Sequence, residues 1–134
     1  MKQFDIQSIH LTAPTTEVFE FIADPHNLPR WAQAFKKVSN GRATLQTTNG
    51  TIEINLTVEA SEKQGTIDWI MNFPDGAVAR ACSRVVPLTA KETIYSFLLL
   101  PPPVPLEALE GALVQQSRTL KEELARLKTI LDQG

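Results

Sequence analysis

The sequence predicts an α+β domain in which a curved antiparallel sheet is covered by a long carboxyl-terminal helix. Three observations favour this architecture. Residues 33–100 form strand-like segments separated by turn signals of hairpin length. A proline-rich stretch at 101–105 then interrupts the chain, and leucines recur at helical spacing after it. The short connections favour antiparallel pairing, because parallel strands need crossovers of about a dozen residues or more.

The amino-terminal segments predict one strand followed by two short helices. Residues 2–11 alternate polar and apolar side chains, which is typical of a strand. Pro14 suits the first turn of a helix that Thr12 can cap. Asp24 can cap a second helical turn, which Pro29 keeps short.

Turn signals divide the central region into six further strands, so the predicted sheet has seven. These signals are Asn40-Gly41, Asn49-Gly50, Ser61–Gly65, Pro74–Gly76 and Pro87–Lys91. The final helix carries an apolar stripe of Leu106, Leu109, Leu113, Leu120, Leu124, Leu127 and Leu131. Because the stripe follows a sheet with one apolar face, we interpret it as a lid on that sheet rather than a coiled coil. Formation of a homodimer through the exposed edges is a further alternative.

Strand alternation gives the predicted sheet one apolar face and one polar face. The apolar face holds Ile52, Ile54, Leu56, Val58, Ile67, Trp69, Met71, Phe73, Ala77, Ala79, Ala81, Ser83, Thr93, Tyr95, Phe97 and Leu99. One strand therefore offers only small side chains beside strands that offer large ones. This leaves a volume that either the long helix or a ligand must fill.

Composition bounds the function further. The 134 residues fit one domain, 1–134, and a net charge of -2 with interspersed signs argues against a nucleic-acid partner. The single cysteine allows no intrachain disulfide and favours a reducing, cytoplasmic setting. The sequence shows neither a secretory signal nor an apolar run long enough for stable membrane insertion.

Two amino-terminal segments resemble a known family. Residues Ile9–Ile22 and Asp24–Trp31 carry, in order, an apolar strand, Ala-Pro, Val-Phe, Asp, Leu-Pro and Trp. This order is similar to the opening signature of the START-like (SRPBCC) superfamily of polyketide cyclases, lipid-transfer domains and plant pathogenesis-related allergens. Leu120–Lys128 resembles the family's final helix, so the resemblance covers nearly the whole chain.

The resemblance implies the helix-grip fold, with an elongated apolar cavity between the long helix and the sheet. Across the superfamily this cavity holds sterols, lipids, polyketides or hormones, and a minority of members catalyse cyclisation or dehydration there. We therefore expect a protein that binds a small hydrophobic molecule and needs no cofactor. The alternatives are a polyketide cyclase or dehydratase and a protein-interaction module whose cavity is filled. The expected ligand-binding residues are Trp69, Met71, Phe73, Ala79, Ala81, Ser83, Tyr95, Phe97, Leu113 and Leu120.

Few polar residues are candidates for chemistry, and no catalytic set is visible. The two histidines, His10 and His26, have no partners at metal-ligand spacing, so we expect no metal site. His26 either caps the second helix or faces solvent, whereas His10 either faces solvent or lines the cavity as an acid or base. Ser83 and Tyr95 either hydrogen-bond a ligand carbonyl or are ordinary buried hydroxyls.

The polar face of the sheet carries a second candidate cluster. Asp68, Arg80 and Arg84 form a solvated ion-pair group in the predicted register. If the register slipped by one residue, the same side chains would line the cavity and anchor a ligand. Cys82 is expected to face the same way, near arginine, and to be inert.

Overall fold

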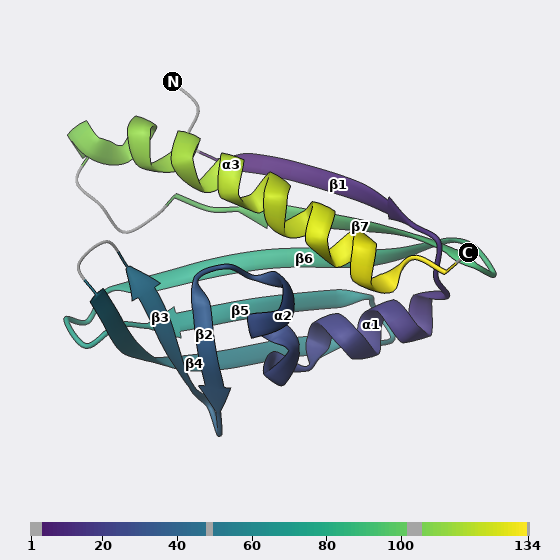
Figure 1. The fold of residues 1–134 in the computed structure, drawn as a ribbon, viewed down its shortest axis with the longest axis horizontal. Helices are drawn as coiled ribbons and strands as arrows, with labels where there is room; N and C mark the ends of the chain where they lie inside the picture. Colours follow the sequence, from purple (N-terminus) through teal and green to yellow (C-terminus); the bar gives the residue numbers. More distant parts are fainter. Residues whose placement is uncertain (1–3, 48–49, 102–105, 134) are drawn as a thin grey trace.

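The sheet is the body of the molecule (Figure 1). In the computed structural model, the described residues 4–47, 50–101 and 106–133 form seven antiparallel strands in the order β1-β7-β6-β5-β4-β3-β2. The strands are β1 (Asp5–Leu11), β2 (Phe35–Ser39), β3 (Arg42–Thr47), β4 (Gly50–Ser61), β5 (Thr66–Asn72), β6 (Val78–Thr89) and β7 (Glu92–Leu99). The helices are α1 (Thr15–Ala23), a 3-10 turn η1 (Pro25–Asn27), α2 (Leu28–Trp31) and α3 (Leu106–Leu131). The predicted fold class is confirmed.

The helix starts agree only partly with the sequence prediction. Asp24 caps the short helical turn as expected, because its carboxylate accepts the backbone N–H of His26 at 3.0 Å. The prediction that Thr12 caps α1 was wrong, since α1 begins after Pro14 without a side-chain cap. Thr12 instead anchors the end of α3: its backbone N–H donates to Asp132 Oδ1 at 2.9 Å, and its carbonyl accepts the Gln133 N–H at 2.8 Å.

The hairpin turns set the register of the sheet. Asn40 and Gly41 both have positive φ, at 48° and 79°, as a two-residue hairpin turn requires. The predicted turn at Pro87–Lys91 is shorter than expected, because β6 continues through Pro87 to Thr89 across a register shift. A proline without an N–H is tolerated at such an irregularity. Asn49 and the proline stretch at 102–105 lie outside the described residues.

The predicted register of the central strands is confirmed. Trp69 of β5 lies opposite Ala81 of β6, and Met71 lies opposite Ala79. Ser83 of β6 lies opposite Phe97 of β7. The inner face of the sheet is therefore the apolar one, and its most deeply buried side chains include Ile54, Ile67, Val85 and Tyr95.

Helix α3 covers one side of that face. Figure 1 shows it running along β1 and β7, and its side chains Leu113, Leu120, Leu124 and Leu127 are buried. The side chains of Leu106 and Leu109 lie outside the described residues. Near its carboxyl end, Lys128 Nζ donates to the His10 carbonyl of β1 at 2.6 Å. Four of the five stripe leucines whose side chains are described are thus buried within this chain and Leu131 is half-buried, as the lid interpretation predicted.

Gly65 provides a test of this packing. Its φ is +73°, and a Cβ at this position would collide with the carbonyl oxygen of Val85, whose N–H donates to the Gly65 carbonyl at 2.7 Å. Gly65→Ala therefore combines backbone strain with a steric clash, and we expect it to lower the free energy of unfolding by about 2 kcal/mol or more. Denaturant titration followed by circular dichroism measures this loss.

The matched control is Gly76→Ala, at a φ of +91° with open space around the added methyl group. This variant carries the strain alone, which costs about 1–2 kcal/mol. Equal losses in the two variants would show that Gly65 is not held against β6.

Candidate functional site

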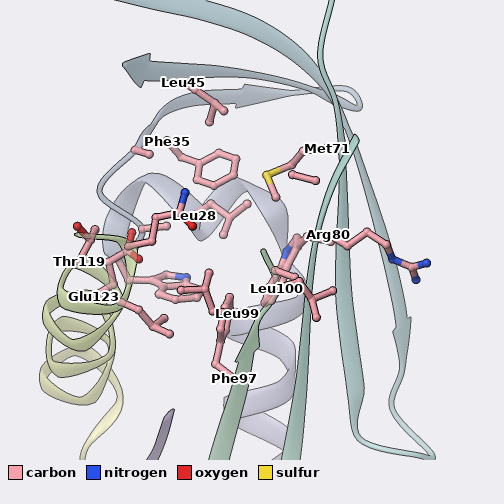
Figure 2. Close-up of a pocket in the computed structure, with 18 of the residues that line it drawn as sticks. Leu28, Phe35, Leu45, Met71, Arg80, Phe97, Leu99, Leu100, Thr119 and Glu123 are labelled. Carbon is pink, nitrogen blue, oxygen red and sulfur yellow. The ribbon is translucent and has the colours of Figure 1, made fainter. Parts of the chain in front are cut away.

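A cavity of about 380 Å³ lies between the inner face of the sheet and the helices (Figure 2). The sheet contributes Leu45, Trp69, Met71, Phe73, Ala79, Ala81, Phe97 and Leu99. The helical side contributes Leu28 and Trp31 of α2, the following Ala32 and Ala34, and Gln116, Thr119, Leu120 and Glu123 of α3. Figure 2 shows Thr119 and Glu123 on one side of the cavity and Met71, Leu99 and Leu100 on the other.

The cavity exists because small and large side chains face each other unevenly. The side chains of Ala79 and Ala81 project only a short distance from the sheet, whereas a row of larger aromatic rings lies beside them. Trp31 meets Trp69 edge to face with ring centroids 6.3 Å apart, and Trp69 stacks on Phe97 at 5.8 Å. Rings packed in this way resist collapse, so the volume above the alanines stays open.

Seven of the ten expected ligand-binding residues line this cavity. They are Trp69, Met71, Phe73, Ala79, Ala81, Phe97 and Leu120. Ser83 and Tyr95 lie on the same face of the sheet but beyond the aromatic cluster. Leu113 is buried farther along α3, beside a shallow groove that includes Asp5 and Gln7.

The two expected hydroxyls are buried in the core. Ser83 Oγ donates to the Ile67 carbonyl at 2.7 Å. Tyr95 is fully buried, and its ring meets Phe97 edge to face at 6.4 Å. Burial raises the pKa of the Tyr95 hydroxyl far above its ordinary value, although the neighbouring Ser83 side chain lowers it. Tyr95 is thus held neutral and away from the cavity.

Both histidines face solvent. His10 Nε2 lies 2.7 Å from Glu92 Oε1 on the outer face, and its hydrogen bond holds the pKa of the Glu92 carboxyl below its ordinary value. The alternative in which His10 lines the cavity was wrong. His26 Nδ1 lies 3.1 Å from the Asp24 carboxylate. Within the described part of the chain, no group of His, Cys, Asp or Glu side chains is arranged to hold a metal ion.

Asp68, Arg80 and Arg84 also lie on the outer face, because the register did not slip. The expected ion-pair group was wrong, since no salt bridge joins Asp68 to either arginine in the described structure. Arg80 pairs with Ile70, and Asp68 pairs with Cys82. Although Arg80 belongs to the cavity wall, Figure 2 shows its side chain extending away from the cavity. Burial, followed by the nearby Asp68 charge, raises the pKa of the Cys82 thiol.

Glu123 is the cavity residue that the sequence analysis missed. It is half-buried on α3, and its Oε2 accepts the backbone N–H of Gln33 at 2.6 Å. Burial raises the pKa of the Glu123 carboxyl to about 7, more than the Gln33 hydrogen bond lowers it. The available signal was its place beside the leucine stripe, three residues after Leu120.

Two indole N–H groups in the cavity wall are also unusual. Trp31 Nε1 and Trp69 Nε1 are buried, and neither has a hydrogen-bond partner among the described residues. A buried donor without an acceptor costs about 1–3 kcal/mol. Both donors belong to rings that line the cavity.

Comparison with solved structures finds the same fold over nearly the whole chain. A START superfamily protein from Mycobacterium smegmatis aligns with a TM-score of 0.69 at 13% identity and covers 97% of both chains. The Zhui aromatase/cyclase from Streptomyces sp. R1128 aligns with a TM-score of 0.68 at 12% identity, covering 94% of this chain and 91% of that one.

A third similar structure is longer than this chain. BexL, the di-domain ARO/CYC from the BE-7585A biosynthetic pathway, aligns with a TM-score of 0.69 at 21% identity, covering 96% of this chain and 46% of BexL. No family model matches the sequence, and neither does any curated protein. Among the described helices, none has the length and apolar character needed to cross a membrane. The chain therefore has the START-like fold that its opening motifs predicted.

Proposed function

We propose that this protein binds one small hydrophobic molecule, such as a lipid, a polyketide or an aromatic metabolite, in the cavity beside Ala79 and Ala81. The observation that carries the proposal is the open volume of about 380 Å³ above these two alanines. Ligand pockets in proteins measure about 300–1,000 Å³ and are lined mainly by apolar and aromatic side chains. The single cysteine of the chain fits a cytoplasmic location for this binding.

The composition of the wall supports an apolar occupant. Apart from Arg80, whose side chain extends away from the cavity, the sheet side consists of apolar residues, and Leu28, Trp31 and Leu120 add apolar surface from the helices (Figure 2). Removing apolar surface from water is favourable by about 25 cal/mol per Å². Because the aromatic rings already hold the wall in place, little of this gain is spent on ordering the site.

The aromatic side chains of the wall make an aromatic molecule one candidate ligand. Trp69 and Phe97 stack on each other with ring planes inclined by 26°, and both residues belong to the apolar lining of the cavity. Two of the structures with the same fold are named as aromatase/cyclases, which supports an aromatic polyketide as one candidate class.

The alternatives receive less support. A cyclase or dehydratase was expected to use His10, or Tyr95 with Ser83, for proton transfer, and none of the three lines the cavity. An interaction module with a filled cavity does not fit the open volume. Binding is therefore the function that the geometry favours.

The direct test is native mass spectrometry of the protein purified from its own host. We expect a mass shift from a co-purifying apolar molecule that disappears when the protein is denatured. Extraction with organic solvent and reapplication of the extract should restore the shift. Protein that stays free of ligand even after incubation with lipid and polyketide extracts of that host would contradict the proposal.

A substitution that fills the cavity should block binding. Ala81→Leu adds volume between Trp69 and Leu99, the two residues that flank position 81 in the sheet. We expect the Kd of the neutral fluorophore 1-aminoanthracene to rise by about tenfold or more, which corresponds to about 1.4 kcal/mol. Fluorescence titration measures the Kd, and thermal unfolding checks that the variant is folded.

Two further variants make this test secure. Ala79→Leu fills the same cavity from a half-buried position two residues away, in case Ala81→Leu does not fold. Ala60→Leu makes the same change in β4 at an exposed position outside the cavity wall and should leave the Kd unchanged. If both cavity variants bind the fluorophore as well as the unsubstituted protein and are more stable, the volume is only a packing void.

A further inference from the structure

Polar side chains on α3 interrupt the apolar wall of the cavity. Gln116, Thr119 and Glu123 are spaced by three and four residues, which places them on one face of the helix. Across the cavity, the labelled side chains of Met71, Leu99 and Leu100 are all apolar (Figure 2). The cavity is therefore two-sided, with a hydrogen-bonding edge along α3 and an apolar floor on the sheet.

We propose that Glu123 determines ligand specificity by selecting molecules that present a hydroxyl or amino group to α3 and rejecting those that present a carboxylate. The inference rests on the proposed binding function and names the chemical class of its ligand: an apolar body with a hydrogen-bond donor on one edge. A carboxylate in the wall accepts hydrogen bonds from hydroxyl and ammonium groups, and it repels a second carboxylate at close range.

The position of Glu123 is fixed from outside the cavity. The backbone N–H of Gln33 donates to Glu123 Oε2 at 2.6 Å, and Gln33 Nε2 donates to Glu122 Oε2 at 3.0 Å. Gln33 therefore holds two neighbouring carboxyl groups of α3 against the segment that follows α2. A carboxylate has about four acceptor positions, so the single bond to Gln33 leaves Glu123 with capacity for a ligand donor.

The charged groups around Glu123 do not neutralise it. Arg126 and Glu122 act on it from its own helix with opposite signs. From the α2 side, Gln33 offers dipoles only, and Arg30 lies over the ring of Phe21, 5.0 Å from its centroid. From the sheet, the side chain of Arg80 points away from the cavity (Figure 2). Burial outweighs these influences and raises the pKa of Glu123 to about 7.

The same carboxyl group should make folding stability depend on pH. The pKa of Glu123 rises from an ordinary 4.5 to about 7 on folding, so the folded protein binds more protons than the unfolded chain between these values. The contribution of Glu123 to stability is therefore fully present below pH 4.5 and is lost as pH rises through 7.

The variant Glu123→Gln removes this dependence and keeps an oxygen that can accept the Gln33 hydrogen bond. We expect its melting temperature, relative to the unsubstituted protein, to rise between pH 5.5 and pH 8. Glu122→Gln, one residue away and outside the cavity wall, should leave the relative curve nearly flat. Parallel curves for Glu123→Gln and the unsubstituted protein would show that Glu123 is solvated.

Specificity is tested with three naphthalene probes that differ only in one edge group: 2-naphthalenemethanol, 2-naphthylmethylamine and 2-naphthoate. Isothermal titration calorimetry of the full chain at pH 8 should give a Kd for 2-naphthoate at least about tenfold higher than for the alcohol and the ammonium probe. At pH 5.5, where Glu123 is protonated and naphthoate is still ionised, the difference between alcohol and naphthoate should shrink.

The variants separate the possible results. Glu123→Gln should bind the alcohol and naphthoate with a ratio that does not change with pH, whereas Glu122→Gln should keep the full discrimination. If all three probes bind equally well at pH 8, or if the ratio between alcohol and naphthoate still changes with pH in Glu123→Gln, the specificity proposal is overturned and the binding function stands. If no probe and no aminoanthracene binds, both proposals fail together.

Discussion

The pairing of β6 with its two neighbours, β5 and β7, is the constraint on which the rest of the molecule depends. It sets Trp69 opposite Ala81 and Met71 opposite Ala79, so large and small side chains share one face. Because side chains alternate along a strand, a slip of β6 by one residue would turn Ala79 and Ala81 to the other face while Trp69 and Met71 stayed on the inner one. The same register carries Asp68 and the Arg80 side chain outward. The cavity and the polarity of both faces are therefore consequences of one set of hairpins.

The sequence predicted which face of a strand or helix each residue occupies. It did not predict how far along that element the cavity extends. Strand alternation gives the face of a residue but not its position along the sheet, so Ser83 was predicted beside the cavity although it lies beyond the aromatic rings. Leu113 and Leu120 share one stripe of α3, but seven residues of helix span about 10 Å, and only Leu120 reaches the cavity. In both cases the sequence predicted the correct face, because the periodicity of a strand or helix depends only on neighbouring residues.

Residues brought to the site by docking of distant segments could not be predicted in this way. Glu123 meets Gln33 across 90 residues of chain, and Leu28 and Phe35 enter the wall only because α2 contacts both α3 and β2. Trp31, the last residue of the amino-terminal motif, meets Trp69 of the sheet edge to face at that junction. No spacing rule in the sequence connects a polar residue of α3 to that junction.

Several energetically unfavourable features of this fold lie in one wall. The open volume, the unpartnered N–H groups of Trp31 and Trp69, and the partly desolvated carboxyl of Glu123 are each unfavourable for folding, and all belong to the same cavity. Away from it, the buried Ser83 and Thr93 hydroxyls donate to backbone carbonyls, whereas the buried Tyr95 hydroxyl has no hydrogen-bond partner among the described residues. The clustering of three unfavourable features at one cavity supports the proposal that a ligand binds there. An apolar ligand with a polar edge would fill the volume and offer Glu123 a hydrogen-bond donor.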